Sequence, residues 1–375
     1  MRDFALEVYF SKWEFAVKHN LTGSDAENMT LGELLAVASP EDRAQFENLG
    51  LGYTQTFGSP ALRQEISLTY ETVQPDQLLC FAGAEEGIYA AMRVLLTADD
   101  HAIVITPNYQ AAETVPLSIC AVTGVALDID RNWDLDLEVL RSALRPNTKL
   151  ISINFPNNPT GKIIPRGIFD ALIDICRGRG IWLFSDEVYR SIERDPALRL
   201  PQIVDVYERG ISLNVMSKVY GLPGLRIGWL ACKDRALLVR FEHYKHFLSI
   251  CNSAPSEFLA GIALKSRERI LSRNRQIVRN NAALLNTFFA DYATRFDWRE
   301  PDGGCVGFIR YKGTDGVEEF TRRLVEEAGV LLLPSSLYAS ELGPVPSDCF
   351  RVGFGKLRVA ESITALRRWL DKNPR

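Results

Sequence analysis

From about residue 60 to residue 232, short apolar runs alternate with segments of helical periodicity. The runs "LLCF", "HAIVIT", "KLISIN", "IWLFS" and "ISLNVM" are apolar on both faces, which is typical of strands buried on both sides. Between them, "AEEGIYAAMRVLLTA" places Ile88, Met92 and Leu95 on one face of a helix. Buried strands separated by helices predict an α/β fold, with a mostly parallel central sheet as the middle of three layers.

A chain of 375 residues has room for a second domain. After about residue 265, a long helical stretch leads to the weaker strands "GCVGFIRY", "GVLLLP" and "CFRVGF" and to a final helix, "ESITALRRWLDK". We therefore expect a large α/β domain at 46–265 and a smaller C-terminal α+β domain at 266–375. An N-terminal segment, 1–45, is expected to join the small domain.

Composition excludes several classes of function. Hydrophobic residues make up 46% of the chain and charged residues 24%, as in packed globular proteins. The net charge of −4, without a block of like charges, gives no support for nucleic-acid binding. The start "MRDFALEVYFSKWEF" does not resemble a secretory signal, and no apolar run approaches the ~18 residues of a membrane span. Seven scattered cysteines and four histidines form no metal-binding pattern, so we expect reduced thiols, a cytoplasmic location and no metal.

Polar residues follow the predicted strands where each strand ends. Tyr109 follows "HAIVIT", Asn158 follows "KLISIN", Asp186 and Tyr189 follow "IWLFS", and Lys218 follows "ISLNVM". In parallel α/β sheets, ligands bind beyond the carboxyl ends of the strands. If the strands are parallel, these side chains meet at one edge of the sheet and form a pocket.

Each of these residues also has an ordinary structural explanation. Asp186 could be a helix N-cap, and Asn158 stands in "NNPTG", a good turn sequence. Tyr109 and Tyr189 could fill the core, and Arg226 could form a surface ion pair worth only about 0–1 kcal/mol.

Lys218 is harder to explain in this way, because it is flanked by "VM" and "YGLPG" and is poorly placed for free solvation. Desolvation and a nearby cation would lower its pKa and leave it nucleophilic. A lysine of this kind usually forms a Schiff base with a carbonyl.

The motifs "FPNNPTG", "SDEVYR" and "SKVYGLPGLRIGWL", in this order, resemble those of the class I/II aminotransferases, within the fold-type I enzymes that use pyridoxal 5'-phosphate. "GYTQTFGSPALRQEI" and "CFRVGFG" extend the similarity to about residues 48 to 355. The resemblance implies a three-layer large domain with a smaller α+β domain, pyridoxal phosphate as the cofactor, and a homodimer with shared active sites.

The resemblance also implies roles for residues that match the motifs. Lys218 would hold the cofactor as a Schiff base and then move the proton of the substrate's α-carbon. Asp186 would pair with the pyridine nitrogen, in a charge-assisted contact worth roughly 3–4 kcal/mol to the reaction. Asn158 and Tyr189 would hydrogen-bond the ring hydroxyl, and Tyr109 would stack on the ring.

A second group of residues would bind the cofactor phosphate. Arg226 supplies a guanidinium, and the helix start in "GAEEGIY" supplies the backbone of Ala84 and Glu85. Ser217 would assist with its hydroxyl. In this family the counterpart of Tyr53 reaches the phosphate from the neighbouring subunit.

Arg351 would bind the substrate carboxylate bidentately, and Asn158 and Gly23 are further residues expected to bind substrate. The chain departs from the family at Val215, where many members have a hydroxyl residue that contacts the phosphate. We therefore expect cofactor binding to depend more on Arg226 and on backbone amides.

The segment "NLTGSDAENMTLGELL" also departs from the family pattern. Asp25, Glu27, Glu85 and Glu86 are candidate acids near the mouth of the site. They could be solvated surface residues and a helix N-cap. Alternatively, one or two of them select a substrate with a cationic side chain. No second arginine matches a dicarboxylate pocket, which disfavours acidic substrates.

The leading functional prediction is an aminotransferase that converts an amino acid and a 2-oxo acid through a Lys218 Schiff base and a pyridoxamine phosphate intermediate. The alternative is an elimination or cyclisation on the same cofactor, in the synthesis of a metabolite derived from an amino acid. A non-catalytic, ligand-sensing relative is a third possibility, and the presence of both Lys218 and Asp186 disfavours it.

Overall fold

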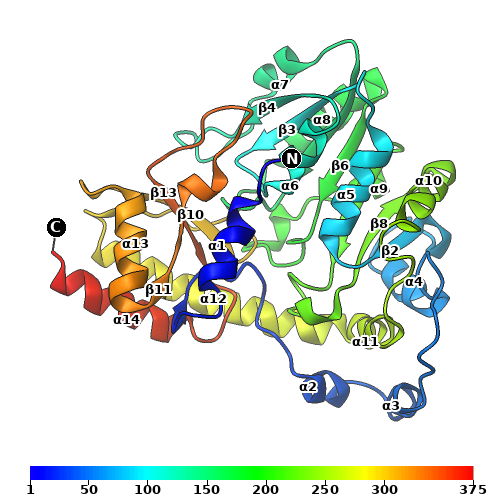
Figure 1. Cartoon of the computed structure of the whole chain (residues 1–375), viewed down its shortest axis with the longest axis horizontal. Coiled ribbons are helices and arrows are strands. Elements are labelled where there is room, and N and C mark those ends of the chain that lie inside the picture. Colours follow the sequence, from blue (N-terminus) through cyan, green and yellow to red (C-terminus); the bar gives the residue numbers. More distant parts are fainter. Residues whose placement is uncertain (375) are drawn as a thin grey trace.

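The structure is a computed structural model, which describes residues 1–374. Its central feature is a seven-stranded sheet with the order β2-β8-β7-β6-β5-β3-β4 (Figure 1). The strands are β2 (Leu78–Phe81), β3 (His101–Thr106), β4 (Ala121–Ala126), β5 (Thr148–Asn154), β6 (Trp182–Asp186), β7 (Gly210–Val215) and β8 (Gly228–Cys232). β8 is antiparallel to both of its neighbours, and the pairs from β7 through β4 are parallel. The sheet is therefore mostly parallel, as predicted.

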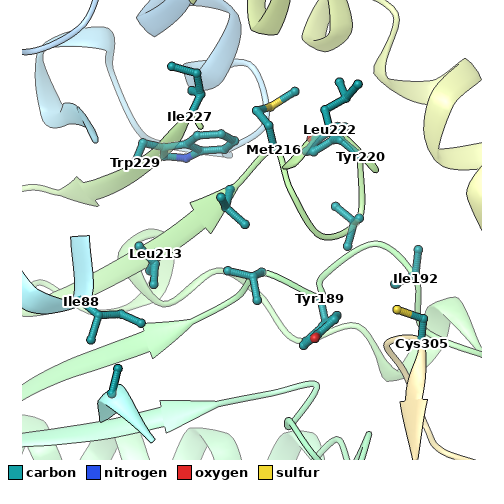
Figure 2. Packing of buried hydrophobic residues seen from close by; sticks show 14 of the residues in the cluster. Ile88, Tyr189, Ile192, Leu213, Met216, Tyr220, Leu222, Ile227, Trp229 and Cys305 are labelled. Atoms are coloured by element: carbon teal, nitrogen blue, oxygen red, sulfur yellow. The ribbon is translucent and has the colours of Figure 1, made fainter. Parts of the chain in front are cut away.

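Helices cover both faces of this sheet. They are α4 (Pro60–Ser67), α5 (Ala84–Leu95), α6 (Ala111–Leu117), α7 (Leu137–Ala143), α8 (Arg166–Arg179), α9 (Ile203–Val206), α10 (Arg235–Lys245) and α11 (Ala254–Lys265). One buried cluster contains Ile88 of α5 together with Leu213 and Trp229 of the sheet (Figure 2). A second cluster contains Phe169 of α8 and Ile151 of β5. The two clusters make the predicted three layers, because each strand buries side chains on both faces.

The C-terminal part is built on a four-stranded antiparallel sheet with the order β12-β13-β10-β9 (Figure 1). Its strands are β9 (Phe296–Asp297), β10 (Val306–Tyr311), β12 (Leu333–Pro334) and β13 (Cys349–Gly353). The helices of this part are α12 (Arg267–Asp291), α13 (Val317–Ala328) and α14 (Val359–Lys372). The run "GVLLLP", expected as one strand, is divided into β11 (Val330–Leu331) and β12.

The N-terminal segment reaches both parts of the molecule. β1 (His19–Asn20) pairs in parallel with β11, which joins the segment to the C-terminal part. α1 (Ala5–Trp13) lies between the large sheet and the C-terminal part in Figure 1, and α2 (Leu31–Ala36) and α3 (Pro40–Glu47) follow it. The boundaries at residues 45 and 265 stay a prediction. No helix within residues 1–374 combines the length and the apolar character that a bilayer crossing requires.

Candidate active site

A cavity of about 390 Å³ lies beyond the carboxyl ends of β2, β3, β5, β6 and β7. Its lining residues come from the strand ends, from the first turn of α5 and from α1. They are Phe4, Glu7, Ala84, Glu85, Ile88, Tyr109, Asn154, Asn158, Asp186, Val188, Tyr189, Ser217, Lys218 and Arg226. The structure thus brings together nine of the residues singled out from the sequence.

Lys218 follows the end of β7 by three positions and is held by the N-terminal segment. Its Nζ donates a hydrogen bond to Ser24 Oγ at 2.8 Å. Burial lowers the pKa of Lys218, and the nearby Arg351 guanidinium lowers it further, whereas Asp25 and Asp186 oppose the effect. A depressed pKa keeps more of the amine neutral, which is the form that attacks carbonyls and accepts protons.

Asp186 is the last residue of β6 and faces the same cavity. Burial raises the pKa of Asp186 to about 6, while the N–H of Val188, 3.1 Å from Oδ1, and the Lys218 ammonium both oppose the rise. A cationic nitrogen bound in the cavity would stabilise the carboxylate and lower this pKa. The site therefore fits a ring whose nitrogen carries a proton.

Asn158 and Tyr189 are fixed by the N-terminal segment and by Arg351. Asn158 Oδ1 accepts a hydrogen bond from Arg351 Nη1 at 3.0 Å, and Arg351 Nη2 donates to the Thr22 carbonyl at 2.7 Å. The Tyr189 hydroxyl donates to the Ser24 carbonyl at 2.9 Å, and burial raises its pKa well above the ordinary value. Arg351 is fully buried behind Asn158 and is not among the lining residues of the cavity.

One end of the cavity has the features of an anion site. Helix α5 begins at Ala84 without a side-chain cap, so its first N–H groups are free to bind a ligand. A Cβ on Gly83, which has a φ of +95°, would lie 2.5 Å from Arg226 Nη2, so glycine allows the guanidinium to approach. Val215 has an apolar side chain buried in the core, so this position has no hydroxyl that could bind an anion.

Three of the four candidate acids are occupied within the fold. Asp25 Oδ2 pairs with Lys356 Nζ at 2.7 Å, and Glu27 Oε2 accepts from the Leu357 N–H at 2.6 Å. Glu86 accepts from the backbone N–H groups of Ala82 at 2.5 Å and of Ser249 at 3.0 Å. None of these three candidates is among the lining residues of the cavity.

Glu85 is the fourth candidate acid, and it lines the cavity. Burial raises its pKa to about 7, and the Tyr109 hydroxyl opposes the rise.

Besides Arg351, two predicted residues lie outside the lining of the cavity. Tyr53 is 93% exposed and contributes nothing to the cavity of its own chain. Gly23 lies against Gly353 of β13, and the contact is so close that a Cβ on Gly353 would overlap the Gly23 carbonyl. No group of three or more His, Cys, Asp or Glu in the described part of the chain is arranged to hold a metal ion.

Sequence reasoning missed the contribution of α1. The rings of Phe4 and Tyr109 lie 4.9 Å apart, and the Tyr109 hydroxyl donates a hydrogen bond to Glu7 Oε1 at 3.4 Å. The i,i+3 spacing of Phe4 and Glu7 indicates a shared helix face. It does not indicate which surface that face covers, because the contact spans more than a hundred residues of chain.

Comparison with known proteins agrees with this geometry. The sequence profile of the family described as "Aminotransferase class I and II" matches residues 19–367. The chain is 25% identical over 359 residues to capreomycidine synthase from Streptomyces vinaceus, covering 93% of this chain and 88% of that protein. It is 28% identical over 317 residues to an arginine–pyruvate transaminase from Pseudomonas aeruginosa, covering 80% and 77% of the two chains.

Among solved structures, a PLP-dependent aminotransferase from Streptococcus suis superposes with a TM-score of 0.92 and 30% sequence identity, covering 99% of this chain and 98% of that one. The cavity fits the same cofactor, because a lysine whose pKa is lowered, a buried carboxylate and the features of an anion site surround one space. The chain therefore belongs to the class I and II aminotransferases, with the fold of the fold-type I enzymes and pyridoxal 5'-phosphate as its cofactor.

Proposed function

We propose that the protein transfers the α-amino group of an amino acid to a 2-oxo acid, with Lys218 moving the proton. The observation that carries this proposal is the placement of Lys218 and Asp186 in one buried cavity, with the pKa of the lysine lowered. When bound, pyridoxal phosphate supplies an electron-withdrawing ring that makes the α-proton of the amino acid acidic.

The residues around the cavity divide between the two ends of that cofactor. Arg226, Ser217 and the N–H groups of Ala84 and Glu85 would bind the phosphate at the start of α5. Asp186 would face the pyridine nitrogen and keep it protonated.

Three further side chains would place the ring. Asn158 and Tyr189 would bind the ring hydroxyl, and Tyr109 would pack on the ring face. Their own contacts limit their movement, since Asn158 is held by Arg351 and Tyr189 by the Ser24 carbonyl. Prepositioned groups of this kind lower the cost of orienting the reactants.

Lys218 Nζ would accept the proton from the substrate's α-carbon and deliver it to a different carbon, two bonds away. This 1,3-shift of a proton is the step that separates amino transfer from simple binding. Arg351 would bind the α-carboxylate, with Gly23 at the same end through its contact with Gly353 of β13. The Ser24 hydroxyl, which accepts a hydrogen bond from Lys218, would hold the free amine when the cofactor is absent.

A homodimer is part of the proposal. Leu51, Tyr53 and Phe247 are large apolar or aromatic residues that are 82%, 93% and 87% exposed. Exposed side chains of this size favour burial against another surface. In a dimer, Tyr53 would reach the phosphate site of the second copy. The cytoplasmic location stays a prediction.

Two observations support the alternative reaction, an elimination or cyclisation. Burial raises the pKa of Glu85 to about 7, so this carboxyl could donate or accept a second proton near neutral pH. A second proton-carrying group is what a reaction beyond the α-carbon needs. The similarity to capreomycidine synthase, at 25% identity, agrees with this alternative.

One experiment separates the two reactions. The cofactor-loaded protein is mixed with single amino acids in the absence of a 2-oxo acid, and its absorbance spectrum and products are followed through one turnover. Transamination leaves pyridoxamine phosphate and a 2-oxo acid, and Lys218→Ala leaves neither. A new product formed while the original spectrum returns without an acceptor would instead establish elimination or cyclisation.

A further inference from the structure

We propose that Glu7 and Glu85 form a subsite that selects amino acids with a cationic side chain, a guanidinium or an ammonium group. The inference rests on the proposed function, because it concerns the substrate of the same cavity. Both residues line that cavity, Glu7 from α1 and Glu85 from the first turn of α5.

Both carboxyl groups interact with the Tyr109 hydroxyl. The Tyr109 hydroxyl donates to Glu7 Oε1 at 3.4 Å, a long bond that leaves most of the Glu7 carboxylate free to accept others. Glu85 Oε2 is buried and has no hydrogen-bond partner within the described residues. An unpartnered buried carboxylate oxygen is costly, and a cationic ligand would remove that cost.

The charges of the cavity support the same conclusion. Arg226 and Lys218 are the basic residues of its lining, and Glu7, Glu85 and Asp186 are the acidic ones. In the proposed function, Arg226 and Asp186 bind the two ends of the cofactor and Lys218 carries out proton transfer. Glu7 and Glu85 are then the carboxylates without an assigned cationic partner, and a cationic side chain would balance them.

The position of these acids suits a substrate side chain. The segment at Thr22 and Ser24 contacts Arg351 and Lys218, where the α-carboxylate and the α-carbon are expected. The Glu7 and Glu85 side chains belong to a different wall, made by α1 and by the start of α5, whose backbone N–H groups are the ones proposed to bind the phosphate. A long side chain can therefore reach this wall while the reacting end stays beside Lys218.

The N-terminus that carries Glu7 is held in place by a buried carboxylate. Glu113 is 1% exposed and accepts from Arg2 Nη2 at 2.6 Å, from Ser340 Oγ at 2.7 Å and from Asn108 Nδ2 at 3.2 Å. Through Glu113, Arg2 before α1 is connected to Asn108, which follows β3, and to Ser340 in the C-terminal part. A subsite organised before binding gains affinity, because little freedom is lost when the ligand arrives.

The test compares L-arginine with L-citrulline, a neutral amino acid of nearly the same shape. Binding is measured by calorimetry on the cofactor-loaded Lys218→Ala protein, in which the proposed reaction does not proceed. We expect arginine to bind at least about tenfold more tightly than citrulline, as for a charge-assisted hydrogen bond. Glu7→Gln or Glu85→Gln should each reduce that preference by about three- to tenfold.

Glu138→Gln is the matched control, because its carboxylate on α7 is 84% exposed and should not affect the preference. Glu7 is exposed, so Glu7→Gln tests the subsite even if Glu85→Gln does not fold. Failure of arginine to bind, equal binding of arginine and citrulline, or an equal loss for both ligands in Glu7→Gln would overturn the inference.

The inference and the proposed function fail in different ways. Turnover of L-aspartate in preference to L-arginine by the unmodified enzyme would overturn the cationic subsite and leave transamination intact. Arginine-selective binding without transfer of its amino group would support the subsite and refute transamination.

Discussion

Replacing Asp186 with asparagine should stabilise the cofactor-free protein while disabling the enzyme. Burial raises the pKa of this carboxyl from its ordinary 3.8 to about 6. A pKa that is higher by about two in the folded state corresponds to a loss of about 3 kcal/mol of stability when the carboxyl is charged. Because the folded pKa lies above the unfolded one, the folded state holds the proton more tightly. The cost of burying the charged carboxylate is absent below about pH 4, grows as the pH rises and reaches its full value above about pH 6.

Asparagine is of similar size, can still accept the Val188 N–H bond and has no charge to bury. We therefore expect Asp186→Asn to raise the free energy of unfolding by about 3 kcal/mol at pH 8, and by about 1 kcal/mol at pH 4.5. Urea denaturation of the cofactor-free protein at both pH values measures the difference. Asp174→Asn, at a side chain 77% exposed, is the control and should change stability by less than about 0.5 kcal/mol.

In the cofactor-loaded enzyme the same change removes the charge-assisted contact proposed for the ring nitrogen. We expect kcat to fall about 10²- to 10³-fold, measured with the best amino donor. An unchanged kcat would refute the role of Asp186 in catalysis. If Asp186→Asn is no more stable than the unmodified protein at pH 8, the folded protein does not bury this carboxylate at a cost and the argument is refuted.

Two further changes probe other parts of the site, and a third tests a buried lysine outside it. Arg351→Lys should raise KM for the amino donor about 10- to 100-fold without changing the absorbance of the bound cofactor, because the bidentate contact with the substrate carboxylate is lost. An unaltered KM would contradict the proposal that Arg351 binds this carboxylate. Gly83→Ala should weaken cofactor binding at least about tenfold in an absorbance titration, since its Cβ would lie 2.5 Å from Arg226 Nη2 at a φ of +95°. Gly178→Ala, with nothing within 4 Å of its Cβ, should bind the cofactor normally. Lys245→Met should lower the free energy of unfolding by about 2–4 kcal/mol, because the fully buried ammonium serves the carbonyls of Thr56 and Cys80; urea denaturation showing a loss below about 0.5 kcal/mol would count against this.

Much of the large sheet could be predicted from local patterns. "HAIVIT" coincides with β3, and the other apolar runs match their strands to within a residue or two. A strand covered on both faces needs apolar side chains in every position, so a short window of sequence carries the signal. Because parallel strands end at a common edge, the placement of Tyr109, Asn158, Asp186 and Lys218 around one cavity followed from the same signal.

The N-terminal helices and their contacts could not be predicted in this way. Ser24 and Lys218 are 194 residues apart in the sequence, and Glu7 and Tyr109 are 102 apart. No local pattern specifies which surface a short amphipathic helix covers, since that choice depends on the shape of the assembled sheet and of the C-terminal part. Glu86 is another example, because it was a candidate acid of the site in the sequence and its carboxylate accepts hydrogen bonds from two backbone N–H groups in the fold.

The sequence by itself determined five of the seven strands of the central sheet and the functional groups that follow them, because both depend on periodicity and on motifs a few residues long. It did not indicate β4, β8 or the order of the strands in the sheet. The tertiary structure alone decided which acids remain free to meet a substrate. Asp25 and Glu27 are occupied by residues more than three hundred positions away, whereas Glu7 and Glu85 face the cavity. Whether a carboxylate is free depends on the partners that folding brings to it, and that is a property of the whole chain.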